Sequence, residues 1–345
     1  MAKVELKHIW KIFGANPQGM LRAISESDSR DDIQQKSGHV IGVRDVSFDV
    51  AEGEIFVVMG LSGSGKSTLV RCLSRLIEPT AGQVIINGAD VMAMNRVDLR
   101  NLRRHTVSMV FQRFGLFPHR RVIDNIAYGL EVQGVKPAER RARAHQVLEL
   151  VGLQGWERAY PHELSGGMQQ RVGLARALTV DPEIMLCDEP FSALDPLIRR
   201  DMQNELLNLQ KALQKTIIFI THDFLEAIKL GDRIAIMKDG AVVQIGSAQQ
   251  IVARPANEYV REFTRDVPRV KVLTAASVMQ PIRESHHFSD RPILHTMTLE
   301  ALIPRVIGVD GSVPVVDEHG GLLGTLDRRS VLLAMTENTV GATNQ

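Results

Sequence analysis

The sequence predicts an α/β fold built on a mainly parallel sheet, followed by a smaller module. Between residues 40 and 264, short apolar runs alternate with longer helical patterns, which is typical of strand and helix units around such a sheet. The clearest buried strands are EIFVVM, EIMLCD and TIIFIT. A length of 345 residues is too long for one average domain and suits a large domain plus a smaller piece.

The charge balance and the hydropathy argue against two kinds of partner or location. Lys and Arg total 41 against 40 Asp and Glu, so no field of a single sign is expected and nucleic acid is not an expected partner. No stretch approaches the roughly 18 to 20 apolar residues that span a bilayer. The opening segment, MAKVELKHIWKIF, also lacks the apolar region of a signal peptide. We therefore expect a chain that stays in the cytosol and does not cross the membrane by itself.

Three segments depart from the alternating strand and helix pattern. Residues 15–39 are rich in Ser, Asp and Gln and predict a surface insertion between KIF and GVRDVSFDV. Residues 115–165 turn helical and predict a helical subdomain. Near the end, PVVDEHGGLLGTLDRRSVLLAM indicates a strand, a Gly-rich turn, a second strand and a helix. We predict one domain over residues 1–265 and a separate module over 266–345.

A phosphate-binding loop follows the strand EIFVVM. The residues GLSGSGKS match G-x-x-x-x-G-K-[ST] and open a helical pattern, which is the context that the motif requires. Glycines let the backbone N–H groups wrap the phosphates, and the helix N-terminus adds a positive dipole end. Kinases, GTPases and motor ATPases share such a loop, so it does not fix the class by itself. The predicted nucleotide-binding residues are Gly60, Ser62, Gly63, Ser64, Gly65, Lys66, Ser67 and Thr68.

Two carboxylates stand at the end of the strand EIMLCD. Asp188 and Glu189 lie at the carboxyl edge of the predicted sheet, where ligands of doubly wound folds bind. Adjacent residues of a strand face opposite ways, so the two acids are expected to take different roles. We predict that Asp188 holds Mg²⁺ together with Ser67, and that Glu189 polarises the attacking water.

Two polar residues follow other apolar runs at the same edge. His222, in ITHD, follows TIIFI, where a donor can reach a γ-phosphate, although a lone histidine is more often structural. Gln112 follows VSMVF and can present its amide to the metal or to the water. The catalytic candidates are therefore Glu189, His222 and Gln112. The candidate Mg²⁺ ligands are Ser67, Gln112 and Asp188.

The segment LSGGMQQR completes a set of motifs that resembles the ATPases of ABC transporters. The resemblance covers residues 2–265, and its markers follow the family's order: phosphate loop, Gln112, LSGGMQQR, MLCDEP, SALD and His222. It implies a P-loop NTPase fold, the ABC ATPase domain with a RecA-like core and a helical subdomain. It also implies hydrolysis of ATP with Mg²⁺. In the family, the region after the glutamine, here Phe114 to Tyr128, docks membrane partners.

The resemblance further implies a homodimer in which the LSGGMQQR segment of one subunit closes on the ATP of the other. A serine and backbone amides at a helix N-terminus make a second anion cradle. Asp195 first reads as the N-cap of a helix, and its family role as a dimer contact can hold at the same time. Phe13 is the better match for the aromatic that stacks on adenine, with Trp10 as the alternative. The residues of the second cradle are Ser165, Gly166, Gly167 and Gln169.

Three features resemble the branch of importers for glycine betaine, proline and choline. They are the insertion at residues 15–39, the strings MGLSGSGKSTLVRCLSRLIEPTAGQV and DEPFSALDPLIRRDMQNEL, and a tail similar to the second half of a regulatory CBS motif. The resemblance implies permease subunits in the membrane, an external substrate-binding protein and a location on the cytoplasmic face of the membrane.

The sequence leaves three other functions open. One is an importer for taurine or an amino acid. Another is a soluble ABC ATPase that acts on ribosomes or DNA repair complexes, although such proteins usually carry two cassettes or a long coiled coil. The third is a nucleotide sensor in which the tail is the working part.

Overall fold

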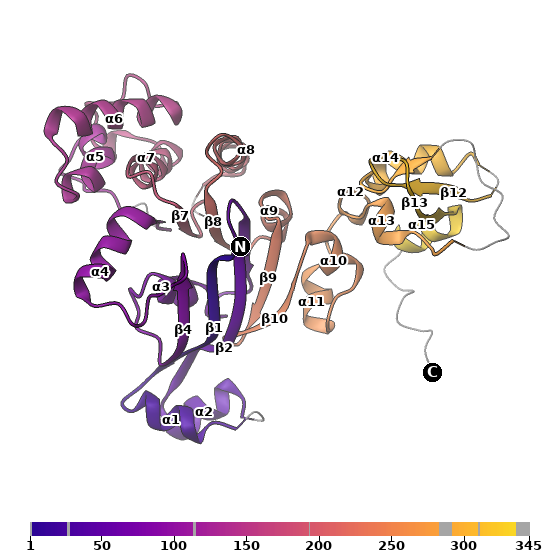
Figure 1. The fold of residues 1–345 in the computed structure, drawn as a ribbon, viewed down its shortest axis with the longest axis horizontal. Coiled ribbons are helices and arrows are strands. Elements are labelled where there is room, and N and C mark those ends of the chain that lie inside the picture. The colour runs from indigo at the N-terminus through magenta and orange to yellow at the C-terminus, as the bar shows by residue number, and fades with distance from the viewer. Residues whose placement is uncertain are drawn as a thin grey trace. The chain divides into compact units, whose positions relative to one another are not determined.

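The computed structural model describes residues 2–25, 28–112, 115–192, 194–282, 292–309 and 311–335. The chain divides into two compact units, Met1–Val243 and Gln244–Gln345, which we describe separately. Figure 1 shows their elements. None of the helices within the described ranges is long and apolar enough to span a membrane.

The first unit is built on a six-stranded sheet with the strand order β10-β9-β3-β8-β7-β6. Neighbours from β9 to β6 pair in parallel. Every residue of β3, β7 and β8 is buried, as expected for central strands of a parallel sheet. This confirms the α/β prediction and the three strands read from the sequence. The strands are β3 (Ile55–Met59), β6 (Val107–Val110), β7 (Ile184–Asp188), β8 (Thr216–Thr221), β9 (Arg233–Lys238) and β10 (Ala241–Gly246).

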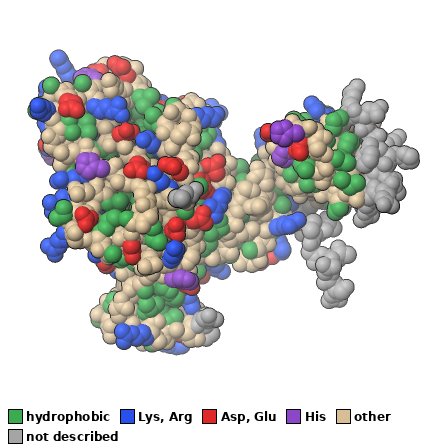
Figure 2. Space-filling model, in the orientation of Figure 1, with side chains coloured by type: hydrophobic (Ala, Val, Ile, Leu, Met, Phe, Trp, Pro, Cys, Tyr) green, Lys and Arg blue, Asp and Glu red, His purple; other side chains and the backbone are tan. Residues whose placement is uncertain are grey.

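A second sheet, with the order β2-β1-β4-β5, is antiparallel. Phe48 of β2 stacks on Phe56 of β3 with ring centroids 4.6 Å apart, so the two sheets share apolar packing. In Figure 2, acidic and basic side chains are interspersed over the visible face of this unit, in keeping with the net charge of +1. The strands are β1 (Ala2–Phe13), β2 (Val40–Ala51), β4 (Ala81–Ile86) and β5 (Ala89–Asp90).

Two short helices, α1 (Pro17–Ala23) and α2 (Arg30–Ser37), connect β1 to β2. Asn16 and Ser29 cap them through side-chain oxygens that accept backbone N–H groups. Within the described part of this segment, Ile33 is the residue of these two helices that is buried. The predicted surface insertion is therefore a pair of helices.

The remaining helices of the first unit cover the parallel sheet and form a helical group. The contacts of α5 with α6 and α7 hold that group together, as Figure 1 shows. Helices α5 and α6 fall within the segment predicted to be helical. The helices are α3 (Lys66–Leu73), α4 (Arg96–Asn101), a π-helix (Leu102–Thr106), α5 (Val122–Val132), α6 (Pro137–Leu150), a 3₁₀ turn (Pro161–Glu163), α7 (Gly166–Thr179), α8 (Pro196–Leu213) and α9 (Phe224–Leu230).

The second unit carries a small sheet in which β11 runs parallel to β12, and β12 pairs antiparallel with β13. The strand, turn, strand and helix read from PVVDEHGGLLGTLDRRSVLLAM correspond to β12, β13 and α15. Its elements are α10 (Ala248–Ala253), α11 (Glu258–Phe263), α12 (Arg269–Val272), α13 (Ala275–Val278), β11 (Ile293–Leu294), α14 (Leu299–Val306), β12 (Val313–Val316), β13 (Leu322–Leu326) and α15 (Arg328–Met335).

The division between the units falls before the boundary that we predicted after residue 265. Helix α10 contacts α12 and α13, and Arg269 donates a hydrogen bond of 3.1 Å to the carbonyl of Val252. These contacts join α10 to the elements that follow it. The sequence pattern marks a change of composition near residue 265, whereas the packing changes after Val243.

Candidate functional site

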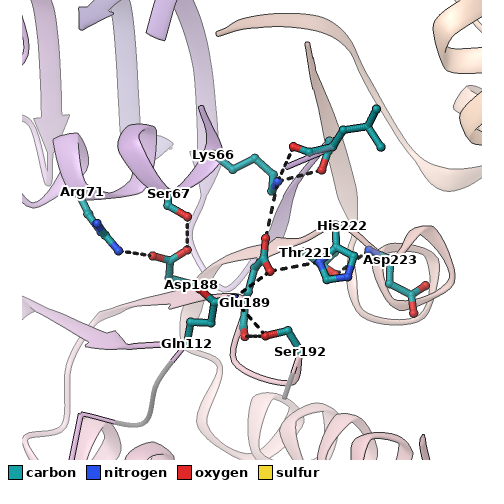
Figure 3. A network of polar contacts seen from close by, with 12 residues as sticks. Lys66, Ser67, Arg71, Gln112, Asp188, Glu189, Ser192, Thr221, His222 and Asp223 are labelled. Carbon is teal, nitrogen blue, oxygen red and sulfur yellow. Dashed lines mark hydrogen bonds and ion pairs between the residues drawn. The ribbon is translucent and has the colours of Figure 1, made fainter. Parts of the chain in front are cut away.

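The polar residues predicted for the site meet where the parallel strands end. The register pairs Met59 with Thr221 and Asp188 with Ile220, so the carboxyl ends of β3, β7 and β8 lie at one edge. Figure 3 shows the side chains that follow these strands pointing toward one another.

The loop between β3 and α3 depends on glycines that no other residue can replace without movement. Gly65 has φ of 101°, and a Cβ there would lie 2.1 Å from the carbonyl oxygen of Gly42. Gly60 has φ of 152°, and its Cβ would lie 2.3 Å from the carbonyl oxygen of Met237. The backbone is therefore folded tightly around the start of α3. Ser62 and Gly63 form the exposed outer part of the loop.

Lys66 lies inside the loop rather than in solvent. Its side chain is only 4% exposed, and Nζ donates to the carbonyl oxygens of Gly60 at 2.8 Å and Leu61 at 3.0 Å. Burial lowers the pKa of Lys66, and the nearby Glu189 carboxylate, 3.6 Å away, opposes that change. Ser64 Oγ is buried and has no hydrogen-bond partner within the described chain. An ammonium and an unpaired hydroxyl in a glycine loop suit a phosphate ligand.

Asp188 and Ser67 form the oxygen pair predicted to hold Mg²⁺. Ser67 Oγ donates to Asp188 Oδ1 at 2.7 Å, and Asp188 is buried at the end of β7. Mg²⁺ is usually bound by one or two protein oxygens together with water and substrate phosphates, so this pair fits the ion. Arg71 contacts the other carboxylate oxygen, Oδ2, at 3.3 Å. Arg71 was not among the residues predicted from the sequence, although its position four residues after Ser67 on α3 places both on one helix face.

Glu189 takes a different set of partners from its neighbour Asp188. Its backbone is left-handed, with φ of 45°, a sparsely populated conformation that clusters at functional sites. His222 Nδ1 lies 3.1 Å from Glu189 Oε2, and Gln112 Nε2 donates to the same oxygen at 3.4 Å. Ser192, also missed, donates to the Glu189 carbonyl at 3.0 Å. The two acids therefore have different partners, and the roles predicted for them stay a prediction.

Gln112 lies on the Glu189 side of the site. Besides Glu189, its amide donates to Ser192 Oγ at 3.4 Å. The described contacts of Gln112 thus place it beside the candidate base, and not on the oxygen pair of Ser67 and Asp188. Its assignment as a Mg²⁺ ligand stays a prediction.

The LSGGMQQR segment forms a helix start with local hydrogen bonds. Ser165 caps α7, and its Oγ accepts the N–H of Met168 at 3.3 Å. Gln169 donates to the carbonyl of Leu164 at 3.2 Å. Ser165 and Gly166 are exposed, whereas Gly167 is buried, and a Cβ there would lie 2.5 Å from Ile198.

Asp195 caps α8, as predicted. Its carboxylate accepts the N–H groups of Leu197 and Ile198, each at 3.1 Å. Asp195 is nevertheless exposed, so the same side chain is accessible to a second subunit.

Phe13 lies closer to the phosphate loop than its alternative Trp10. It is 40% exposed, and a Cβ on Gly42 would lie 2.7 Å from Phe13 Cε2 and 3.1 Å from the methyl of Thr68. The ring is therefore next to α3 across Gly42. Trp10 pairs with Ala81, on the side of β1 toward β4. This geometry favours Phe13 as the residue that would stack on adenine.

Comparison with known proteins places this site in a family. The ABC transporter model matches residues 43–192. The trimethylamine N-oxide transport system ATP-binding protein TmoW of Pelagibacter ubique is 47% identical over 331 residues, which cover 95% of this chain and 96% of TmoW. This chain belongs to the ABC transporter ATP-binding proteins. The resemblance seen in the motifs is thereby confirmed.

Another relative and a solved structure match smaller parts of this ABC ATP-binding protein. The glycine betaine transport ATP-binding protein OpuAA of Bacillus subtilis is 55% identical over 278 residues, covering 81% of this chain and 66% of OpuAA. The dimeric post-hydrolysis structure of the ATP-binding cassette MJ0796, bound to ADP and Pi, superposes with a TM-score of 0.60 at 31% identity. It covers 71% of this chain and 98% of that one.

A glycine substitution tests the phosphate loop of this ABC ATP-binding protein. In Gly65→Ala, the new methyl meets the backbone of Gly42, so the loop must shift, and we expect affinity for MgATP to fall by more than about tenfold, or about 1.4 kcal/mol. Gly134→Ala is the matched control, because Gly134 also has positive φ, 84°, but no atom within 4 Å of a Cβ. Isothermal titration measures both. Equal affinities for the two variants would contradict this role of the loop.

Proposed function

We propose that this protein is the ATP-hydrolysing subunit of an importer that takes up a methylated amine or a related solute such as glycine betaine, choline or proline. The main evidence for hydrolysis is the position of Glu189. Its carboxylate lies 3.6 Å from Lys66 Nζ and 3.1 Å from His222 Nδ1, at the edge of the parallel sheet that also holds the phosphate loop. A carboxylate so placed is suited to act as a general base next to a bound γ-phosphate.

In this proposal, the loop binds the phosphates through Lys66 and the backbone amides, and Thr68 adds a contact. Ser67 and Asp188 would hold Mg²⁺, which when bound neutralises phosphate charge. Glu189 orients a water and accepts its proton as the water oxygen attacks the γ-phosphorus. The bond to the leaving oxygen then breaks, which yields ADP and phosphate. His222 keeps the Glu189 carboxylate oriented and offers a donor to the γ-phosphate.

The second half of each site would come from another subunit. Ser165 and Gly166 are exposed at the start of α7, and Asp195 is exposed as well, next to Leu194, which lies beside Gly166. The dimeric state of the MJ0796 structure supports a homodimer here. We place Ser165, Gly166, Gly167 and Gln169 on the ATP of the partner subunit, with Asp195 at the dimer contact.

The solute is inferred from what the relatives transport. Relatives that match most of this chain are named for the transport of glycine betaine, carnitine, choline and trimethylamine N-oxide, which share a methylated nitrogen. They support this class over taurine or amino acids other than proline. TmoW matches almost end to end, so trimethylamine N-oxide joins the candidates that the motifs indicated. The choice among them would lie in the permease and in an external substrate-binding protein.

A pocket of about 260 Å³ offers a place for the permease. It lies where β6, α5 and α7 meet, and its lining includes the exposed apolar side chains of Leu76, Phe111 and Val132. An apolar groove of this kind suits the apolar face of a helix. The pocket includes Tyr128, at one end of the docking region predicted from the family; Phe114, at the other end, lies outside the described residues. The subunit would thus sit on the cytoplasmic face of the membrane.

The order of the elements in the second unit supports a regulatory role for it. From β11 to α15 its elements run strand, helix, strand, strand, helix, the order expected for a CBS-like motif. We propose that this unit is a regulatory module of that type. A complete module needs two motifs, and pairing across the dimer would bring a second one.

Uptake measurements test the proposed function directly. In cells that lack the gene, we expect uptake of one among labelled glycine betaine, choline, proline and trimethylamine N-oxide to be lost and to return with the wild-type gene. Glu189→Gln should bind ATP normally but hydrolyse it at least about a hundredfold more slowly, and it should not restore uptake. Hydrolysis at the parental rate would refute the role of Glu189, and unchanged uptake of all four would refute the solute class.

If the permease binds at this pocket, a change in the pocket lining should affect assembly and uptake but not ATP hydrolysis by the isolated subunit. Val132→Asp puts a charge into the apolar lining, so permease co-purification and solute uptake should be lost. ATP hydrolysis by the isolated subunit should remain within about twofold, because surface substitutions usually change stability by less than about 0.5 kcal/mol and none of the site residues lines this pocket. Leu150→Asp is the control, since Leu150 is a similarly exposed apolar residue, 47% against 38%, outside the pocket lining. Normal permease binding by Val132→Asp would contradict the assignment.

A further inference from the structure

The helical insertion between β1 and β2 reaches the phosphate loop. Arg30, the first residue of α2, donates through NH1 to the carbonyl oxygen of Gly63 at 2.6 Å. Helix α2 is held by its cap, because Ser29 Oγ accepts the N–H of Asp32 at 3.1 Å, and by the burial of Ile33. The guanidinium is therefore presented to the loop from a fixed helix start.

A second series of hydrogen bonds connects the insertion to Ser64, the next residue of the loop. Arg44 of β2 donates to the carbonyls of Asp28 at 2.7 Å and Ser25 at 3.1 Å, both in the insertion. The N–H of Arg44 donates to the Gly240 carbonyl at 2.8 Å, and the N–H of Gly240 donates to the Ser64 carbonyl at 3.0 Å. The two routes thus bind consecutive carbonyls of the loop.

This part of the loop has little packing of its own. Gly63 has φ of 80°, and a Cβ there would meet no heavy atom within 4 Å. Leu61 is 57% exposed, and its carbonyl accepts the Ser64 N–H at 3.2 Å, which closes the turn, and also accepts Lys66 Nζ at 3.0 Å. By contrast, Gly60 and Gly65 are enclosed by neighbouring backbone. The outer turn is therefore positioned mainly by hydrogen bonds from outside.

The two contacted carbonyls belong to the peptides that carry the N–H groups of Ser64 and Gly65, and the Ser64 N–H donates to the Leu61 carbonyl inside the turn. A carbonyl that accepts a hydrogen bond polarises its own peptide, and the N–H of that peptide becomes a stronger donor. A guanidinium does this more strongly than a neutral group. It also adds one positive charge beside the place where triphosphate would bind.

We propose that the insertion is a strap on the phosphate loop and that Arg30 is a positioning residue for nucleotide binding. It acts through Gly63, whose turn it holds in the conformation that receives the phosphates. This inference rests on the proposed ATP site. It gives the insertion at residues 15–39 a role in the affinity of the subunit for ATP.

The test compares Arg30→Met, Arg30→Lys and the control Lys36→Gln, which removes one positive charge from the last turn of the same helix. Binding of a fluorescent ATP analogue, KM and kcat for ATP, and melting temperature without nucleotide are measured for each. We expect Arg30→Met to raise Kd and KM by about threefold to tenfold, as for the loss of one ordinary hydrogen bond, with kcat within about twofold. Arg30→Lys should recover part of the affinity, and Lys36→Gln should match the wild type.

The other outcomes separate this proposal from the site itself. Wild-type affinity in Arg30→Met, with the wild type binding ATP, would overturn the strap and leave the ATP site intact. A fall in melting temperature with no rescue of affinity by Arg30→Lys would also overturn it, because Arg30 would then serve folding alone. A wild-type protein that bound no ATP would instead refute the proposed function.

Discussion

The meeting of β3, β7 and β8 at one edge is the constraint on which the site depends. Parallel pairing places the loop after Met59, the acids at the end of β7 and the residues after Thr221 side by side. Every residue of these strands is buried, so packing on both faces of the sheet holds them in place. This packing positions Lys66, Asp188, Glu189 and His222.

The sequence predicted the sheet, the loop and the two acids because each rests on a local pattern: an apolar run, then glycines or carboxylates. It did not predict Arg30 on Gly63, Arg71 on Asp188 or Ser192 on Glu189, which are contacts set by the packing of distant segments. For the same reason, the sequence did not predict that Gln112 lies beside Glu189 and not beside Ser67 and Asp188. The compact units divide after Val243, before the change of composition on which the predicted boundary rests, because α10 packs with later helices, which composition does not reveal.

Cationic side chains contact both the loop and the acids of the site. Lys66 binds loop carbonyls, Arg71 contacts Asp188 and Arg30 contacts the outer turn, so the loop and the acids are kept in place by positive charges. The arrival of a triphosphate would exchange some of these internal contacts for contacts with phosphate. Ser165 and Gly166 of a second subunit would then complete the site. On this account, nucleotide binding and subunit pairing are one event, and it is this event that is coupled to transport.

Sedimentation velocity of the Glu189→Gln protein, with and without MgATP, tests this coupling most directly. Because binding is retained while hydrolysis is blocked, the account predicts monomers without nucleotide and a stable dimer with MgATP. The dimer should be lost when Ser165→Arg, which would clash at the second cradle, is added. A protein that binds MgATP and remains monomeric would contradict the account.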